Sequence, residues 1–406
     1  MNRLTRFRRD LHQIPELDLD LKKTQSYIVN ALSTLPCKLS MPIKGSVIAY
    51  FDANKNNSIA FRCDMDALSI QEKTKHSFVS KHEGNMHACG HDGHMAIMLE
   101  FAYQLTEYYL ELPHNVVLIF QPGEESVGGA KLLCETGFIN KYHIQAIFGI
   151  HLWPFLEKGK IVTRKKEMMA SAKEVKIDVY GKSSHIAQYQ KGIDAMYYAM
   201  NIIQDLYVYV EKEIPEEEGL LRFGVFQSGT MRNIVSNHTL IEGGLRYFHE
   251  ETYEKIKRFT DEIIIKYKQK GVLIKINYSE GYPTVINDEK LVEWIQDILP
   301  EVGILHEAQM TAEDFSFYQK AIPGVFFFLG TGSSIPLHSD IFNFDEEVLV
   351  HGVELYKAIS KKKKNSTWLL SYFIRNENKR MMIPRINAHK RTLRKVKKSF
   401  KYSLKF

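Results

Sequence analysis

Short apolar runs separated by helical patterns constrain the fold of this chain more than any other feature. The clearest runs are Asn115 to Phe120 (NVVLIF) and Gly324 to Leu329 (GVFFFL). A strand that lacks a polar face must be covered on both sides, as in the sheets of α/β proteins. The same analysis predicts further strands at 46–51, 58–63 and 146–150, and helices at 4–13, 21–35, 91–109, from 128, and at 345–360.

The middle of the chain follows a different order. Strand patterns occur at 174–180, 221–231, 239–248 and 272–278, and helical patterns occur at 193–210 and 252–268. The resulting order β-α-β-β-α-β is that of a ferredoxin-like unit. We therefore predict a catalytic domain formed by 1–172 and 283–360, an inserted domain at 173–282, and a basic tail at 361–406.

The charge of the chain is distributed unevenly. The tail holds 16 of the 54 Lys and Arg residues and one of the 48 acidic residues, so the preceding 360 residues carry a net charge of −9. An acidic body does not indicate a nucleic-acid-binding domain. We expect the tail to be disordered and solvated, with membrane contact as the less favoured alternative.

The expected cellular compartment follows from the lack of a recognisable secretion signal or membrane helix in this sequence. No signal-like apolar segment follows the four arginines of 1–10, and no apolar run approaches the ~20 residues of a membrane helix. The four cysteines are scattered, which is typical of reduced thiols. We expect a cytoplasmic protein.

A dense polar motif, HACGHDGH at 87–94, contains three histidines, one cysteine and one aspartate. Thiolate and imidazole are donors that zinc and similar metals prefer. A glycine-rich surface loop with solvated histidines is the alternative, and the motif alone does not decide between the two.

Polar side chains at the ends of four other predicted strands favour the metal. They are Asp64 and Asp66, Glu124 and Glu125, His151, and His338. Ligands of α/β sheets bind outside the carboxyl ends of the strands, so these groups are expected at one edge.

The candidate donors outnumber the four ligands that a single tetrahedral site can hold. We predict two divalent ions (zinc, manganese or cobalt) bound by Cys89, His91, Glu125, His151 and His338. Glu124 is the expected general base, although spacing alone would also allow the reverse assignment of Glu124 and Glu125. Asp64 and Asp66 either orient a ligand histidine or bind metal directly.

Five motifs together resemble the M20 metallopeptidase family, and within it the M20D amidohydrolase branch. They are RCDMDAL (62–68), MHACGHDGH (86–94), QPGEE (121–125), FGIH (148–151) and EDFS (313–316). The resemblance runs from about residue 7 to 360, with Cys63 and Gly123 where the branch usually has alanine. It implies a mixed-sheet, zinc-peptidase-like catalytic domain with an inserted ferredoxin-like lid and dimerisation domain. It also implies the same five metal ligands and Glu124 as base.

The inserted domain offers three further candidates. In M20 relatives the histidine of a motif like GKSSH (181–185) stabilises the oxyanion, often across a dimer, which implies that role for His185. Asn233 and Arg246 are candidates for binding a substrate α-carboxylate. Each of the three could instead be an ordinary surface residue.

We expect hydrolysis of N-acyl-L-amino acids by a homodimer. The segments 8–16, 23–27 and 67–70 look closest to N-acetyldiaminopimelate deacetylases of lysine biosynthesis, which makes N-acetyl-L,L-diaminopimelate the preferred substrate. A hippurate-type hydrolase or peptidase is the alternative within enzymes. A non-catalytic metal-binding protein is the alternative outside them.

Overall fold

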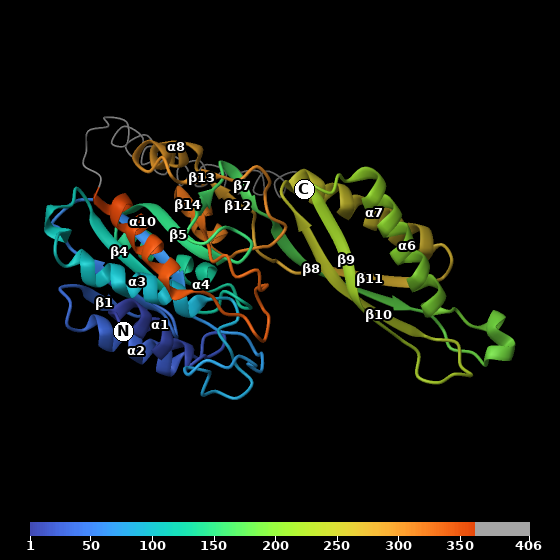
Figure 1. The fold of residues 1–406 in the computed structure, drawn as a ribbon. Coiled ribbons are helices and arrows are strands. Elements are labelled where there is room, and N and C mark those ends of the chain that lie inside the picture. Colours follow the sequence, from blue (N-terminus) through green and yellow to red (C-terminus); the bar gives the residue numbers. More distant parts are fainter. Residues whose placement is uncertain (362–406) are drawn as a thin grey trace, which may run out of the picture. The chain divides into compact units, whose positions relative to one another are not determined.

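The computed structural model describes residues 1–361, which form three sheets and the helices that cover them (Figure 1). The largest sheet has the order β1-β2-β4-β3-β5-β14-β6-β13. Its strands are β1 (Lys38–Ser40), β2 (Val47–Phe51), β3 (Ser58–Asp64), β4 (Asn115–Gln121), β5 (Ile144–Trp153), β6 (Ile161–Thr163), β13 (Gly303–Ile304) and β14 (Gly324–Gly330). Nearly all of the tail lies outside the described residues.

The centre of this sheet is parallel. Strands β4, β3, β5 and β14 are neighbours that run in one direction, whereas β1, β2 and β6 pair antiparallel. Every residue of β3, β4 and β14 is buried. The apolar runs thus have no polar face because helices cover both sides of the sheet.

Helices cover the two faces of the large sheet. They are α1 (Arg3–His12), α2 (Lys22–Leu32), α3 (His91–Leu105) and α10 (Leu349–Lys361) on one side, and α4 (Gly129–Glu135), α5 (Phe138–Lys141) and α9 (Ser316–Ala321) on the other. On the first face Phe61 of β3 packs against Phe101 of α3 and Tyr356 of α10, with ring centroids 5.0 and 4.8 Å apart. Helix α8 (Glu289–Ile298) packs near β14.

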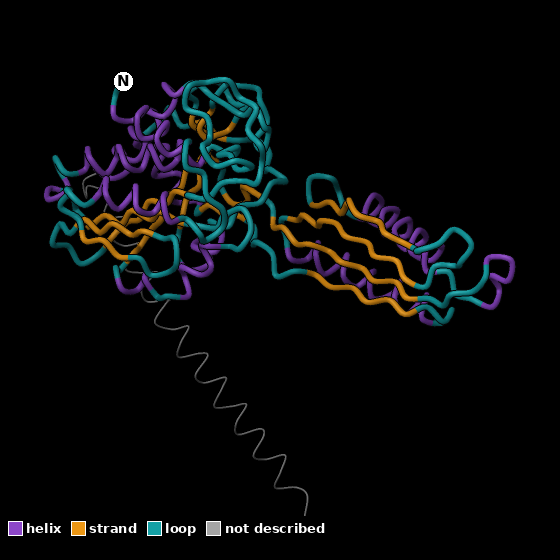
Figure 2. The backbone as a smooth tube through the Cα atoms, turned by 90° about the horizontal axis from the view of Figure 1, so that it is seen from below, coloured by secondary structure: helices purple, strands orange, loops and turns teal. Residues whose placement is uncertain are grey.

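The second sheet is antiparallel, with the order β11-β8-β10-β9. Its elements are β8 (Ser171–Tyr180), α6 (Ala195–Glu213), β9 (Gly219–Ser228), β10 (His238–Tyr247), α7 (Glu250–Lys268) and β11 (Leu273–Tyr278). Figure 2 shows the four strands side by side with both helices on one face. This is the predicted ferredoxin-like order, because the fourth strand pairs with the first and the first with the third.

The predicted fold class is therefore confirmed, with local differences. Helix α3 ends at Leu105 instead of Tyr109, where a 3₁₀ turn (Tyr109–Glu111) follows, and β5 extends past His151 to Trp153. A two-stranded sheet of β7 (Lys166–Met169) and β12 (Val285–Asn287) lies where the chain leads into and out of the inserted sheet. The exact domain boundaries stay a prediction.

Among residues 1–361, no helix combines the length and the hydropathy that a membrane crossing would require.

Candidate metal centre

The predicted donors come together where the parallel strands end. Cys89, Glu124, Glu125, His151 and His338 line one cavity of about 700 Å³. The sheet brings residues from β3, β4, β5 and the loop after β14 to this edge, as the strand directions predict.

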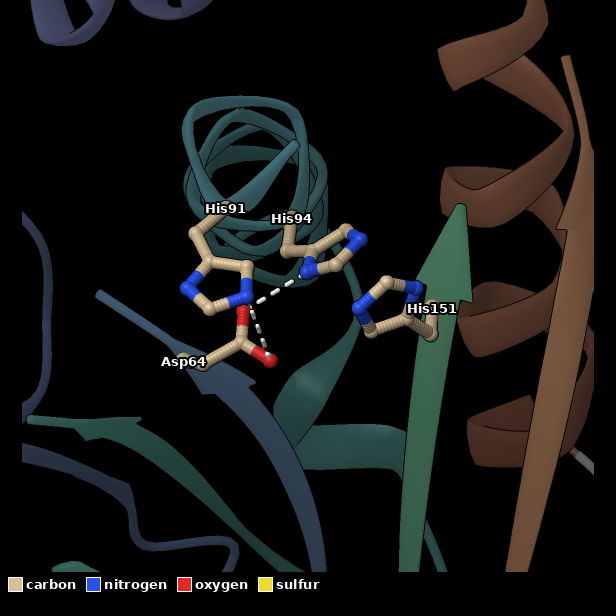
Figure 3. A group of neighbouring side chains, drawn as sticks. All are labelled: Asp64, His91, His94 and His151. Carbon is tan, nitrogen blue, oxygen red and sulfur yellow. Dashed lines mark hydrogen bonds and ion pairs between the residues drawn. The ribbon is translucent and has the colours of Figure 1, made fainter. Parts of the chain in front are cut away.

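The first group of donors joins Asp64, His91, His94 and His151, whose donor atoms all lie within 4.8 Å of one another (Figure 3). His91 and His94 extend from α3, three residues apart and therefore on one face of the helix. All four side chains are buried.

Hydrogen bonds decide which of these histidines can bind a metal. The backbone N–H of Leu152 donates to Nε2 of His94 (2.9 Å), so Nδ1 carries the proton and donates to Oδ1 of Asp64 (2.6 Å). Both ring nitrogens of His94 are thus engaged. His94 positions Asp64 and leaves no lone pair for an ion.

His91 and His151 have the opposite arrangement. Nδ1 of His91 donates to the backbone oxygen of Asp66 (2.8 Å), and Nδ1 of His151 donates to that of Leu152 (2.7 Å). In the neutral form of each ring, Nε2 then carries the lone pair that a metal ion would bind. Burial, with a smaller effect from His94, lowers the pKa of His151 to about 3, so this ring is neutral at physiological pH.

The second group is Cys89, Glu125 and His338. Oε1 of Glu125 lies 3.5 Å from Nε2 of His338 and 3.7 Å from Nε2 of His91, and the Cys89 thiol lies 3.4 Å from Nε2 of His151. The backbone N–H of His338 donates to the carbonyl of Ala88 (2.9 Å), which ties the late loop to the Cys89 motif.

These residues fit divalent ions. Nε2 of His91 and Oε1 of Glu125 are buried without a hydrogen-bond partner, which is costly unless a cation occupies the space between them. Donors around an ion at 2.0–2.2 Å lie roughly 3.3 Å apart, close to the observed separations. Burial and the nearby Glu125 raise the pKa of the Cys89 thiol, and a bound cation would favour its thiolate.

Glu124 and Glu125 have different environments. Burial and the carboxylates of Glu313 and Glu125 raise the pKa of Glu124 well above its ordinary value. Although burial opposes it, His338 and His91 lower the pKa of Glu125. These environments suit Glu125 as a ligand and Glu124 as a proton acceptor, and the assignment stays a prediction.

Asp66 fixes both glutamates through the backbone. Its carboxylate accepts the N–H groups of Glu124 (2.9 Å) and Glu125 (3.1 Å). Burial, opposed by His91 and these two bonds, raises the pKa of Asp66 to about 6. Asp66 is thus placed to orient the glutamates.

A buried arginine, which sequence reasoning missed, connects the acids. Arg62 is fully buried and contacts Asp64 (2.9 Å), Glu313 (3.0 Å) and Asp314 (2.8 Å). Asp314 also accepts hydrogen bonds from Gln121. Asp314 and Glu313 therefore belong to a buried network behind the site.

Of the three candidates in the inserted domain, Arg246 lies apart from His185 and Asn233. Arg246 is half-buried and lines the cavity, and its guanidinium donates a hydrogen bond to the backbone carbonyl of Leu245 (3.2 Å). His185 and Asn233 are exposed and lie side by side, because the N–H of Ile186 donates to the carbonyl of Asn233. Neither His185 nor Asn233 lines the cavity that holds Glu124.

Comparison with known proteins identifies the family. Peptidase family M20/M25/M40 matches residues 60–362. This chain belongs to that family. An uncharacterized hydrolase of Staphylococcus epidermidis is 36% identical over 372 residues, covering 88% of this chain and 97% of the relative. One from Staphylococcus aureus strain USA300 is 35% identical with the same coverage. The predicted resemblance is confirmed.

Solved structures of M20 proteins share the fold. A putative aminohydrolase from methicillin-resistant Staphylococcus aureus matches with a TM-score of 0.83 and 28% identity, covering 88% of this chain and 96% of that one. The YXEP protein of Bacillus subtilis, a dinuclear metal-binding peptidase, matches with a TM-score of 0.76 and 31% identity over the same shares. The chain is a metal-dependent M20 hydrolase.

Proposed function

We propose that the chain hydrolyses the amide bond of N-acyl-L-amino acids with two divalent ions, zinc, manganese or cobalt. Cys89, His91, Glu125, His151 and His338 would hold the ions. The observation that carries the proposal is the position of Glu124. Its carboxylate lines the cavity within 4.8 Å of donor atoms of His91 and Glu125 and has a raised proton affinity. A protein that only binds metal would not need this group.

Each part of the site has one task in the reaction. The ions, when bound, supply Lewis acidity that lowers the pKa of water and polarises the amide carbonyl. Glu124 accepts the proton of the attacking water and returns it to the leaving amine. Asp66 and Tyr282 hold the Glu124 backbone in place, the latter by donating from its hydroxyl to the Glu124 carbonyl (2.7 Å).

Arg246 is the proposed partner of the substrate α-carboxylate. Its guanidinium is half-buried in the cavity wall, and arginine binds carboxylates through two parallel hydrogen bonds. We propose that Asn233 assists from a partner subunit, because it does not line the cavity of its own chain.

N-acetyl-L,L-diaminopimelate, an intermediate of lysine biosynthesis, is the preferred substrate. The distal end of that molecule carries both an ammonium and a carboxylate. The cavity is lined by charges of both signs, including the ion pair of Lys131 and Glu280 (2.6 Å) together with Lys173 and Glu174. Such paired charges suit a zwitterionic end.

An aromatic acyl group, as in hippurate, is the second candidate. Trp153, Phe317 and Met169 line the same cavity and offer apolar surface. Apolar walls of this kind can accommodate the aromatic ring of hippurate, and they support the hippurate-type alternative.

We further propose a homodimer through the inserted domain, with His185 donating to the oxyanion of the partner's reaction. Strand β9 lies at an edge of its sheet. Large apolar side chains are exposed on β9, α6 and the adjoining loops; they are Ile186, Tyr189, Met196, Tyr197, Met200, Phe226, Met231 and Ile234. An exposed apolar patch next to an unpaired edge is typical of an interface.

A substrate panel tests the proposed function. The metal-loaded full chain would be assayed on N-acetyl-L,L-diaminopimelate, hippurate, N-acetyl-L-methionine and a dipeptide, with chelator-treated protein as control. We expect the highest kcat/KM for the first substrate. A higher value for hippurate would favour the aromatic alternative, and turnover of none above the chelated control would contradict amide hydrolysis.

A further inference from the structure

A second group of metal-type donors lies apart from the catalytic cavity. It consists of His12 at the end of α1 and of Glu72 and His76 in the loop between β3 and α3. Oε1 of Glu72 lies 3.3 Å from Nε2 of His12 and 3.4 Å from Nε2 of His76. None of these three residues lines the cavity of Glu124.

We propose that His12, Glu72 and His76 bind a further divalent ion of the zinc type, independent of the catalytic centre. Tetrahedral zinc binds nitrogen and oxygen at about 2.0–2.2 Å, so two of its ligands lie about 3.3 Å apart. Both observed separations match this value. Two imidazoles and one carboxylate also form a donor set that zinc accepts.

The surroundings of the ligands support this assignment. Nδ1 of His12 donates to Oδ2 of Asp92 (2.8 Å), and Arg8 holds the same carboxylate (3.2 Å). A carboxylate behind a ligand histidine fixes the ring and directs Nε2 to the ion. The N–H of Ser80 donates to Oε2 of Glu72 (2.6 Å), and Oε1, which also accepts a hydrogen bond from the hydroxyl of Thr74, faces the two imidazoles.

The ring of His76 is held in place, with Nε2 facing Oε1 of Glu72 (3.4 Å). The ring stacks on Phe78 with centroids 3.9 Å apart and an interplanar angle of 11°. The hydroxyl of Thr74 lies 3.0 Å from Nε2 of His76 and completes a polar shell around the position of the ion.

The charge at this position is suited to a cation. Two carboxylates contact the ring of His12: Oδ2 of Asp92 lies 2.8 Å from Nδ1, and Oε1 of Glu72 lies 3.3 Å from Nε2. This position is therefore surrounded by negative charge, which favours a cation. The ion would link α1 to the loop that leads to the Cys89 motif.

Zinc stoichiometry of the full chain tests the proposal. After equilibration with zinc sulfate and dialysis, we expect His76→Ala to retain one zinc ion fewer than the wild type. His306→Ala, which removes an exposed histidine elsewhere, is the matched control and should retain the wild-type amount. Equal zinc content in the wild type and His76→Ala would overturn the proposal.

Anomalous diffraction at the zinc edge gives an independent result that does not depend on a variant. We expect a peak bounded by Nε2 of His12, Oε1 of Glu72 and Nε2 of His76. A zinc-soaked crystal with peaks at Cys89 and His91 but none at this position would refute the further site and leave the proposed catalytic function intact. The reverse pattern would refute the catalytic centre alone.

Discussion

His94 and His151 carry the same side chain but have different hydrogen bonds, and we expect different consequences when each is replaced. His94 uses both ring nitrogens in hydrogen bonds, whereas Nε2 of His151 is a proposed metal ligand. His94→Gln should retain the metal content and lower activity about 10- to 100-fold, as for groups that orient ligands. His151→Gln should lose metal.

Metal analysis and kcat/KM of the two purified variants check this prediction. If His94→Gln lost as much metal as His151→Gln, the assignment of His94 as a positioning residue would be wrong.

Candidate site residues at the ends of strands can be predicted from the sequence more readily than the buried residues that contact them. Glu125, His151 and His338 could be placed at one edge because parallel strands direct their carboxyl ends to the same side. Arg62 and Glu313 could not be assigned, because a buried charge becomes visible only when its partners from distant segments are known. The three-residue spacing of His94 from His91 could have indicated that His94 lies at the site. Its role could not be predicted, because spacing does not reveal which ring nitrogen carries the proton.

At the scale of elements, the start of α3 depends on glycine. Gly90 has φ +84°, and a Cβ there would lie 3.0 Å from Cδ1 of Leu152. Gly137 has φ +75°, but a Cβ there meets nothing within 4 Å. In chelator-treated protein, Gly137→Ala should lower the free energy of unfolding by about 1 kcal/mol and Gly90→Ala by about 2 kcal/mol or more. Denaturant unfolding measures both, and equal losses would contradict the packing role of Gly90.

The loop before β4 contains a pH-sensitive group. Nε2 of His114 is buried without a hydrogen-bond partner, and burial, only partly opposed by the backbone of Ser360, lowers the pKa of His114 to about 4. Between pH 6.5 and 4 the unfolded chain binds a proton that the folded chain excludes. The free energy of unfolding should therefore fall as the pH drops through this window, by up to about 3 kcal/mol from this residue.

Chemical unfolding at several pH values checks the effect of His114. His114→Asn should show a weaker loss of stability between pH 6.5 and 4 than the wild type, whereas His306→Asn should follow the wild type. Parallel curves for the wild type and His114→Asn would count against this explanation.

Long elements could be predicted from the sequence, whereas short ones could not. The strands β3, β4 and β14 are mainly apolar segments that are buried throughout, and the helices α3, α6 and α7 follow a helical apolar spacing. The two- and three-residue strands β1, β6, β12 and β13 are fixed by pairing with distant partners, which periodicity does not record. The extension of β5 past His151 has the same cause, since β14 pairs with it as far as Trp153.

For the whole molecule, the inserted domain should determine the oligomeric state. Tyr197 and Met200 on α6 are 55% and 52% exposed, and Ile265 on α7 is 60% exposed. If α6 and β9 form the interface, the double variant Tyr197→Glu/Met200→Glu should be monomeric and lose activity, because we propose that His185 acts across the dimer. Ile265→Glu should stay dimeric and active. Light scattering coupled to size-exclusion chromatography measures the molar mass of the wild type and of each variant. A monomeric wild type would contradict the proposal.

The central claim is that Glu124 carries the proton in a metal-dependent amide hydrolysis. The most direct test is the turnover of Glu124→Gln on the best N-acyl-amino-acid substrate, measured together with its metal content. The variant should bind the same number of ions as the wild type, and its kcat should fall by at least about 100-fold. Near-normal turnover with the ions bound would show that another group is the base.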